Sequence, residues 1–274
     1  MAKISKPAAA KHEEAMALVK SGGNLGYDQR WFVAENFRED ANHLNGKAGA
    51  FFTPTALAND FCMGVNYGDG LSRIVDLCAG IGKLSLPIYE RLADKTRLTL
   101  VESNPDYVAV GRKIMPEATW ICADVMDTQQ WWDGLLFDLA ISNPPFGAIG
   151  CKPHAMSLFK NKRLFEFNVV ELAAMIAKDA AFILPQRSVP FQYSGQNGMQ
   201  EQDNPRFNQF HSKTGIGLEI LISVDTSDYI DDWNGVSPLV ELVSFPEEEH
   251  QHSYHNPRFE ASHAEKPGSD ETPP

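Results

Sequence analysis

The stretch that decides the fold is residues 73–82, which read Arg-Ile-Val-Asp-Leu-Cys-Ala-Gly-Ile-Gly. Its first six residues, 73–78, are mainly apolar and predict a strand, and Gly80 and Gly82 follow directly. Glycines at the turn from a strand into a helix allow the backbone to approach a ligand closely. The pattern therefore predicts a strand that leads into a ligand-binding turn.

Strand and helix signals alternate along the chain after this turn. Apolar runs predict further strands, and stretches with helical periodicity separate them. The expected strands are 97–102, 118–123, 136–142 and 180–184, with two closing strands at 218–224 and 239–245, and the expected helices are 83–94, 104–115 and 166–178. This order predicts an α/β fold with a mostly parallel, seven-stranded sheet and helices on both faces.

The regions that flank this alternation have a different character. Residues 1–47 predict an N-terminal helical extension, with helices at 11–20 and 28–44. Residues 185–215 are rich in Gln, Asn, Gly and Pro, and we expect a long flap or target loop there, because such long loops are uncommon unless functional. Residues 246–274 hold seven acids and two basic residues, which predicts a disordered tail.

Composition limits the class of protein. The chain has 274 residues, of which 43% are hydrophobic, enough for a globular core. No apolar run approaches the ~20 residues of a membrane-spanning helix, and the N-terminus has no signal-peptide pattern. The four cysteines are far apart, so neither a metal site nor a disulfide framework is expected. We expect a reducing, cytoplasmic setting in a bacterial or phage-infected cell, with no membrane partner.

The net charge of −12 does not suggest a nucleic-acid-binding protein, but its distribution is uneven. Residues 151–163 contain four basic residues and no acid. Such a patch on an acidic body is compatible with phosphate contact at one place, although a solvated charged loop has the same composition. The candidates for nucleic-acid contact are Lys152, Lys160, Lys162, Arg163 and Arg187.

Three acids lie at the carboxyl ends of successive expected strands. Asp76 precedes the glycine turn and suits a ligand that carries an ammonium group. Glu102 follows about 20 residues later, as expected for a carboxylate that holds ribose hydroxyls. Asp124 follows the third strand and can accept a hydrogen bond from an adenine amino group. Each acid alone is more often a helix cap or a surface residue, but three around one glycine turn favour a nucleoside-containing ligand.

The tetrapeptide Asn143-Pro144-Pro145-Phe146 ends the strand expected at 136–142. Two prolines remove two backbone donors and fix two φ angles, so strand pairing must stop there. An amide oxygen, a fixed carbonyl and an aromatic ring suit a planar group that carries an exocyclic amine. Alone, the tetrapeptide would only indicate a proline-rich loop.

With these motifs together, the chain resembles the class I S-adenosylmethionine-dependent methyltransferases, and among them the DNA adenine-N6 methyltransferases with an NPPF catalytic motif. The resemblance covers roughly residues 48–185 within an expected methyltransferase domain at 48–245. It implies a Rossmann-like fold, S-adenosylmethionine as cofactor and catalytic roles for Asn143 to Phe146. The cofactor-binding residues that it implies are Phe51, Phe52, Thr53, Pro54, Asp76, Cys78, Gly80, Gly82, Glu102, Asp124, Val125 and Asn143.

The resemblance also implies a mechanism and a substrate. Hydrogen bonds from the adenine amine to the Asn143 side chain and the Pro144 carbonyl would localise the nitrogen lone pair, and Phe146 would stack on the flipped base. Aromatic residues of 191–210 are candidates for the opposite face. Family members usually carry a target-recognition domain after the catalytic part. Only a short segment follows the catalytic part of this sequence, so we expect low or short sequence specificity, a separate specificity partner or a homodimer.

Three alternatives remain open. The first is an RNA methyltransferase that acts on an adenine or guanine amine, and the second is a protein-glutamine methyltransferase, whose motif typically ends in Tyr. The third is a catalytically inactive S-adenosylmethionine-binding protein that binds nucleic acid. Cytosine-C5 methylation is disfavoured, because it needs a cysteine nucleophile next to a proline and no cysteine here follows one. Methylation of an exocyclic cytosine amine stays chemically open, because the same hydrogen bonds apply to that amine.

Overall fold

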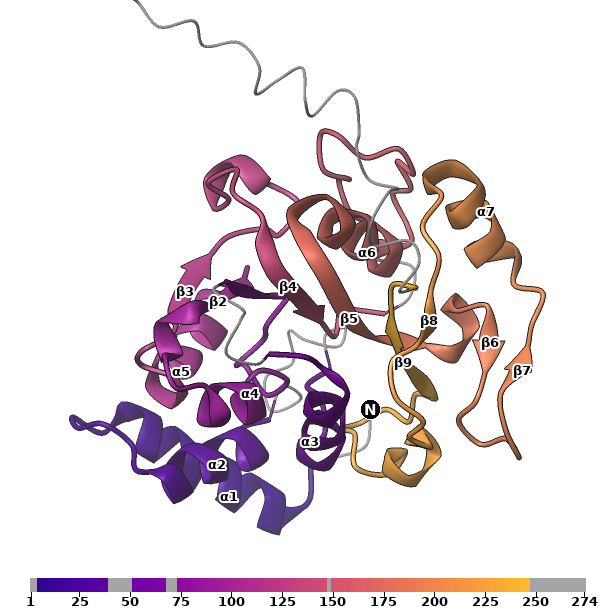
Figure 1. The fold of residues 1–274 in the computed structure, drawn as a ribbon. Coiled ribbons are helices and arrows are strands. Elements are labelled where there is room, and N and C mark those ends of the chain that lie inside the picture. The colour runs from indigo at the N-terminus through magenta and orange to yellow at the C-terminus, as the bar shows by residue number, and fades with distance from the viewer. Residues whose placement is uncertain (1–3, 39–50, 68–72, 147–148, 247–274) are drawn as a thin grey trace, which may run out of the picture.

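The computed structural model describes residues 4–38, 51–67, 73–146 and 149–246. Its centre is a seven-stranded sheet in the order β3-β2-β1-β4-β5-β9-β8 (Figure 1). The strands are β1 (Ile74–Leu77), β2 (Leu98–Glu102), β3 (Thr119–Cys122), β4 (Phe137–Ser142), β5 (Ala177–Pro185), β8 (Glu219–Ile220) and β9 (Val240–Ser244). The first five are parallel, whereas β9 is antiparallel to both of its neighbours.

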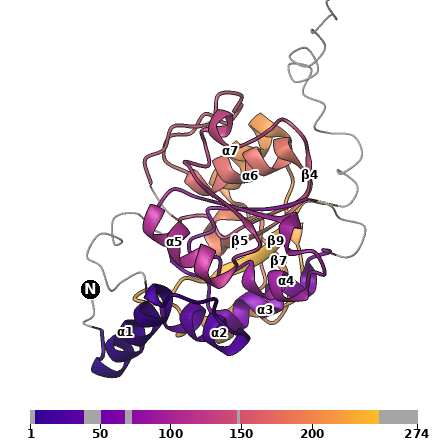
Figure 2. The same cartoon turned by 90° about the vertical axis from the view of Figure 1, so that its left-hand side faces the viewer.

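Helices cover both faces of this sheet (Figures 1 and 2). One layer contains α2 (Tyr27–Asn36), α3 (Thr55–Gly64), α4 (Leu86–Arg91) and α5 (Pro105–Ile114), and α1 (Lys6–Lys20) packs on α2. The opposite layer contains α6 (Phe165–Ile176) and α7 (Pro205–Thr214). Short 3-10 turns lie at Lys95–Arg97, Thr128–Gln130, Gln186–Ser188 and Thr226–Tyr229.

Side-chain alternation along each strand divides the core between these layers. In β5, Ala181 and Ile183 belong to the cluster under α2 to α5, whereas Phe182 and Leu184 belong to the cluster under α6 and α7. Successive side chains of a strand point to opposite faces, so a strand with apolar residues at every position needs cover on both sides. The mostly parallel seven-stranded sheet with helices on both faces is therefore confirmed.

Several expected element boundaries are wrong by a few residues. The helix expected at 83–94 is shorter and spans Leu86–Arg91, and the hydroxyl of Ser85, directly before it, donates to Asp76 of β1. The helix expected at 166–178 ends at Ile176, because Ala177 already pairs with Phe137 of β4. The strand expected at 218–224 is reduced to β8. The helix expected at 28–44 gives way to extended backbone at Phe37, and residues 39–44 lie outside the described residues.

The expectation of a long loop at 185–215 is wrong. This segment contains a hairpin of β6 (Phe191–Gln192) and β7 (Gln200–Glu201), followed by α7. The Asn204 side chain accepts hydrogen bonds from the N–H groups of Arg206 and Phe207, and Gly215 ends the helix with φ of 74°. Asparagine before proline and glycine after the last turn are ordinary helix signals, which the polar composition of the segment masked.

Two further expectations fall in part outside what the structure describes. The acidic tail expected at 246–274 lies, from residue 247 onward, outside the described residues, as do residues 48–50 at the start of the expected domain. The sequence interpretation also missed α3, which begins directly after Pro54. In the part of the chain that the structure describes, no helix is long and apolar enough to cross a membrane.

The contact between α5 and β3 gives a test of this packing. A β-carbon on Gly111 of α5 would lie 2.1 Å from the Trp120 ring. Alanine normally stabilises a helix interior relative to glycine by about 1 kcal/mol. Here we expect Gly111→Ala to lower the free energy of unfolding by about 2 kcal/mol instead, because a buried indole must shift.

Urea unfolding followed by tryptophan fluorescence measures the change. Gly22→Ala is the matched control, since a β-carbon at Gly22 would meet no atom within 4 Å. An unfolding midpoint for Gly111→Ala equal to or above that of the parent protein would contradict the packing described here.

Candidate functional site

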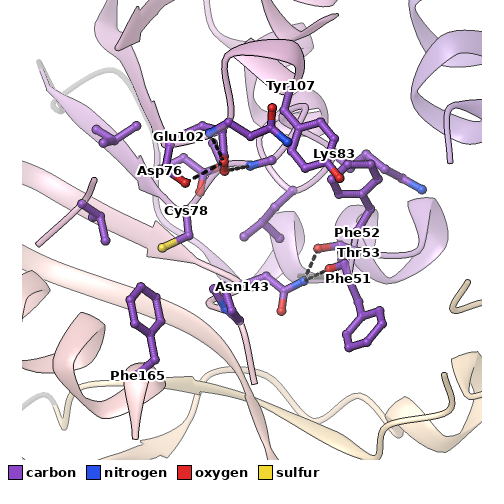
Figure 3. Close-up of a pocket in the computed structure, with 18 of the residues that line it drawn as sticks. Phe51, Phe52, Thr53, Asp76, Cys78, Lys83, Glu102, Tyr107, Asn143 and Phe165 are labelled. Carbon is purple, nitrogen blue, oxygen red and sulfur yellow. Dashed lines mark hydrogen bonds between the residues drawn. The ribbon is translucent and has the colours of Figure 1, made fainter. Parts of the chain in front are cut away.

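A cavity of about 300 Å³ opens where the parallel strands end (Figure 3). The residues directly after β1, β3 and β4 (Cys78, Ala123 and Asn143) and the last residue of β2 (Glu102) all line it. Ligands bind at this edge in open α/β sheets, because the loops after the strands diverge there. The lining also includes Phe51, Phe52, Thr53, Asp76, Ala79, Gly80, Lys83, Leu84, Val101, Ser103, Asn104, Tyr107, Asp124, Val125, Pro145, Ile149 and Phe165.

Asp76 lies on β1 and is only 1% exposed. Its Oδ2 accepts a hydrogen bond from the Ser85 hydroxyl, whereas its buried Oδ1 has no partner among the described residues. Burial raises the pKa of Asp76 to about 7, the Ser85 hydrogen bond opposes this shift, and the charge of Glu102 adds to it. A buried carboxylate without a counter-charge is unfavourable, so this site suits a cationic ligand group.

The turn after β1 has an unusual backbone. Cys78, Gly80 and Gly82 have φ angles of 65°, 57° and 87°. A non-glycine residue in the left-handed region is uncommon and costs about 1–3 kcal/mol, and such residues often cluster at functional sites. At Gly80 a β-carbon would lie 2.8 Å from the Phe52 ring, so the two cavity walls meet only because this residue has no side chain.

Glu102 fixes the same turn from the neighbouring strand. Its Oε2 accepts from the Gly80 N–H at 2.9 Å, and its Oε1 accepts from the Asn104 N–H at 2.8 Å (Figure 3). Burial raises the pKa of Glu102, and the backbone hydrogen bonds oppose that shift. Asp124 follows β3, and its Oδ1 accepts from the Met126 N–H. The structure thus brings all three strand-end acids to one cavity.

Asn143 has an orientation set by its neighbours. Its Nδ2 donates to the Phe51 carbonyl at 3.2 Å and to Thr53 Oγ1 at 2.9 Å (Figure 3). A carbonyl can only accept, so the amide nitrogen must face Phe51 and the amide oxygen must face away. That Oδ1 is buried and has no partner among the described residues. The side chain, which lines the cavity, therefore holds a buried acceptor in a fixed orientation.

The rest of the tetrapeptide is divided between cavity and core. Pro145 lines the cavity and Pro144 is buried. Phe146 is half-buried against the core, with its ring centroid 6.3 Å from that of Trp233. Of the other predicted cofactor residues, Pro54 precedes α3 and Gly82 lies behind the turn, where a β-carbon would meet Met115. Neither lines the cavity.

Sequence reasoning missed several lining residues. Tyr107 of α5 packs edge-on against Phe52, with ring centroids 5.0 Å apart, and against Phe37. Phe165, the first residue of α6, lies across the cavity from Phe52 (Figure 3). The start of α5 directly after β2 placed Tyr107 near this edge of the sheet, although no local signal showed that its ring would reach the cavity. Phe165 lies far from the end of β4 in sequence and had no such signal. Lys83 had no sequence signal beyond its place after the glycine turn.

The other predicted residues lie outside the cavity lining. The basic candidates Lys152, Lys160, Lys162, Arg163 and Arg187 are all exposed. Of the aromatic residues expected to face a base from 191–210, Phe191, Phe207 and Phe210 are buried in the core under α6 and α7, and the half-buried Tyr193 packs against that core outside the cavity lining. All four cysteines are free thiols, and burial raises the pKa of Cys78 well above its usual range.

Comparisons with known proteins agree with this architecture. No protein-family model matches the chain. Its similarity to the tRNA1(Val) (adenine(37)-N6)-methyltransferases of Shigella boydii serotype 18 and Escherichia coli strain SE11 is 33% identity over 82 residues, or 28% of this chain. The match spans about a third (34%) of those curated relatives.

A solved structure extends the likeness to most of the chain. The type I restriction-modification system methyltransferase subunit from Streptococcus thermophilus superposes with a TM-score of 0.52 at 15% identity, covering 81% of this chain and 50% of that one. With the sheet order and the strand-end cavity, this shows that the chain has the Rossmann-like class I methyltransferase fold. The expected fold class is confirmed.

The buried acid gives a prediction about stability and pH. The pKa of Asp76 is raised from 3.8 to about 7, so between these values the unfolded chain loses the Asp76 proton while the folded chain keeps it. The contribution of Asp76 to stability is therefore fully present below pH 4 and is lost as pH rises to about 7. Asp76→Asn cannot ionise, so we expect its stability relative to the parent protein to improve over this range.

Urea unfolding of both proteins at about pH 5 and about pH 8 tests this. The free energy of unfolding of Asp76→Asn, relative to that of the parent protein, should be higher at about pH 8 than at about pH 5. Ser212→Ala, a change at an exposed serine of α7, is the control and should show no pH-dependent difference. An equal Asp76→Asn difference at both pH values would mean that Asp76 ionises normally.

Proposed function

We propose that this chain is an S-adenosylmethionine-dependent methyltransferase that modifies the N6 amine of adenine in nucleic acid, with DNA as the substrate. The observation that carries the proposal is the fixed Asn143 amide, whose buried Oδ1 is an acceptor without a partner among the described residues. An exocyclic amine carries two hydrogens and can satisfy this oxygen.

The cavity fits the cofactor. Asp76 presents a buried carboxylate oxygen to the ammonium end, and Glu102 holds the glycine turn and keeps acceptor capacity for ribose hydroxyls. Asp124 and Val125 line the adenine end, and the Phe52 and Tyr107 rings provide apolar wall. When bound, S-adenosylmethionine supplies a methyl group on a positively charged sulfur.

The residues of this chain then act by positioning the adenine amine. Asn143 Oδ1 and the Pro144 carbonyl accept the two N6–H groups of adenine, which draws the nitrogen lone pair out of the ring. The nitrogen forms a bond to the methyl carbon, and the electron pair of the breaking carbon–sulfur bond stays on sulfur. The methylated nitrogen is cationic and releases its proton to water, so no strong base is needed. Alignment of these atoms accounts for much of the rate.

RNA is a second candidate substrate. The tRNA1(Val) (adenine(37)-N6)-methyltransferases that this chain resembles act on tRNA. Their similarity to this chain, 33% identity over 82 residues, is the observation that favours RNA as the substrate. Both candidates use the same amine and the same acceptors, so the cavity supports either polymer.

A labelling experiment tests the proposal. The protein is incubated with tritiated S-adenosylmethionine and, separately, with duplex DNA, single-stranded DNA, tRNA and protein extract, and labelled nucleosides are identified by mass spectrometry. N6-methyladenine in DNA is the expected result. Label only in tRNA would replace the first candidate with the second, and label in glutamine, or no label despite cofactor binding, would overturn the proposal.

The acceptor role of Asn143 gives a separate prediction. Asn143→Ala removes the acceptor but none of the three acids, so transfer should fall below detection while the Kd for S-adenosylmethionine changes less than about threefold. Isothermal titration and single-turnover assays measure the two quantities. A loss of cofactor binding in parallel with activity would mean that Asn143 has been assigned the wrong role.

The orientation of Asn143 can be tested through Thr53, which is 2% exposed. Thr53→Val keeps the shape but removes the acceptor for Asn143 Nδ2, so kcat should fall about five- to tenfold, the scale of one hydrogen bond. Thr53→Ser is the matched control because it keeps the hydroxyl, and its kcat should stay near that of the parent. Equal kcat values for the two variants would contradict this role.

A further inference from the structure

Residues 149–165 begin and end at the cavity. Ile149 and Phe165 both line the cavity, and residues 150–164 lie between them. The Cys151 N–H donates to the Lys162 carbonyl at 3.1 Å, which closes the neck of a loop at 151–162. Compact loops with close ends that pack on their own side chains are often functional. The two ends of this loop, called the 151–162 loop below, therefore lie next to residues that line the candidate active site.

Two buried polar residues of α6 fix the shape of the 151–162 loop. Glu171, 3% exposed, accepts hydrogen bonds from the Ser157 hydroxyl and from the N–H groups of Leu158 and Phe159. Asn168, fully buried, donates from Nδ2 to the Asn161 and Leu164 carbonyls at 2.7 Å and 3.1 Å. Three donors on one buried carboxylate hold the backbone at the loop tip in place.

The loop tip alternates buried and exposed side chains. Phe159 is 1% exposed and packs edge-on against Phe210, with ring centroids 5.3 Å apart. Leu158, directly before it, is 52% exposed. Single exposed leucines are common and need no explanation. This one differs because its own N–H is bound by a buried carboxylate, so an apolar side chain is displayed from a fixed backbone.

The charge around Leu158 favours a polyanion. Lys152, Lys160, Lys162 and Arg163 are all exposed, and residues 150–164 contain no acid, in a chain with a net charge of −12. Clustered basic side chains contact phosphates, and apolar side chains such as leucine insert between base steps and unstack them. An enzyme that modifies a base inside a duplex must first rotate that base out of the stack.

We propose that the 151–162 loop is a duplex-DNA contact element in which Leu158 acts as a wedge that fills the stack when the target adenine leaves it. The basic side chains hold the phosphates on either side. The inference rests on the proposed function, because it needs a nucleic-acid substrate. It adds a specific requirement: Leu158 matters only where there is a base stack to open.

Activity on the duplex and on the heat-denatured form of the same unmethylated DNA distinguishes the wedge role of Leu158 from a general contact with DNA. Leu158→Ser should lower kcat/KM on the duplex by about tenfold or more and change it less than about twofold on denatured DNA, since single strands need little unstacking. Leu158→Met keeps an apolar wedge and should restore most duplex activity. Leu135→Ser is the matched control, because Leu135 is 65% exposed but precedes β4, at the opposite edge of the sheet.

Substitution of a basic residue of the loop should give a different pattern of activity from Leu158→Ser. Lys162→Gln should lower kcat/KM on both forms of DNA and reduce the dependence of binding on salt, because a phosphate contact serves either strand state. Cofactor affinity should be unchanged in all of these variants, which serves as the measure of correct folding.

The possible failures are distinguishable. If the parent protein methylates duplex DNA and Leu158→Ser does so equally well, the wedge is wrong and the proposed function stands. The same holds if the parent methylates only single-stranded DNA, or if Leu158→Ser loses activity equally on both forms. If the parent transfers methyl groups to tRNA alone or to no nucleic acid, the wedge on duplex DNA is overturned together with the DNA assignment.

Discussion

The hydrogen bonds from Asn143 Nδ2 to Phe51 and Thr53 are the interaction on which the orientation of the candidate acceptor depends. They join the end of β4 to a segment about 90 residues earlier in the chain. This contact closes one side of the cavity, and it also decides which amide atom is left to meet a substrate. Since the carbonyl of Phe51 cannot donate, no alternative flip of the amide satisfies both partners. The same backbone that binds the amide carries Phe52, whose ring contacts the turn at Gly80. The Asn143 amide, the glycine turn and the cavity wall formed by Phe52 are thus parts of one packed unit.

Asp76 is the second constraint, because its burial is unfavourable for folding but suits a cationic ligand. Burial raises the pKa of its carboxyl to about 7, and one oxygen has no partner among the described residues. A buried carboxylate oxygen without a partner is unfavourable for the fold, and Cys78, in the left-handed region two residues later, adds strain. Both features are unfavourable for folding alone and favourable for holding a cationic ligand. Sites of this kind are commonly less stable than they could be, because the binding geometry and not the ligand-free fold determines the residues present.

The sequence predicted those parts of the structure that depend on local signals. The positions of Gly80, Glu102 and Asn143, at or just after strand ends, could be predicted because parallel strands bring their carboxyl ends to one edge. It failed where tertiary contacts decide the outcome. Ala177 became strand because β4 offered a pairing partner, against the helical pattern of the preceding residues. The helix α7 was hidden in a polar segment, although Asn204, Pro205 and Gly215 mark its ends. Nothing local could show that Phe207 and Phe210 are core residues, or that Tyr107 would reach the cavity.

The helix α6 joins the candidate active site, the 151–162 loop and the core of the fold. Its first residue, Phe165, lines the cavity, and Asn168 and Glu171 hold the 151–162 loop while the apolar residues between them pack under the sheet. A buried carboxylate such as Glu171 is unfavourable unless it is fully hydrogen-bonded, and its partners here all belong to that loop. The loop and the helix therefore stabilise each other. A change at Glu171 would disturb both, whereas the exposed Leu158 and Lys162 can be changed with the supporting network left intact. The surface proposed to meet the nucleic acid is held rigid by the same helix that completes the second layer of the sandwich.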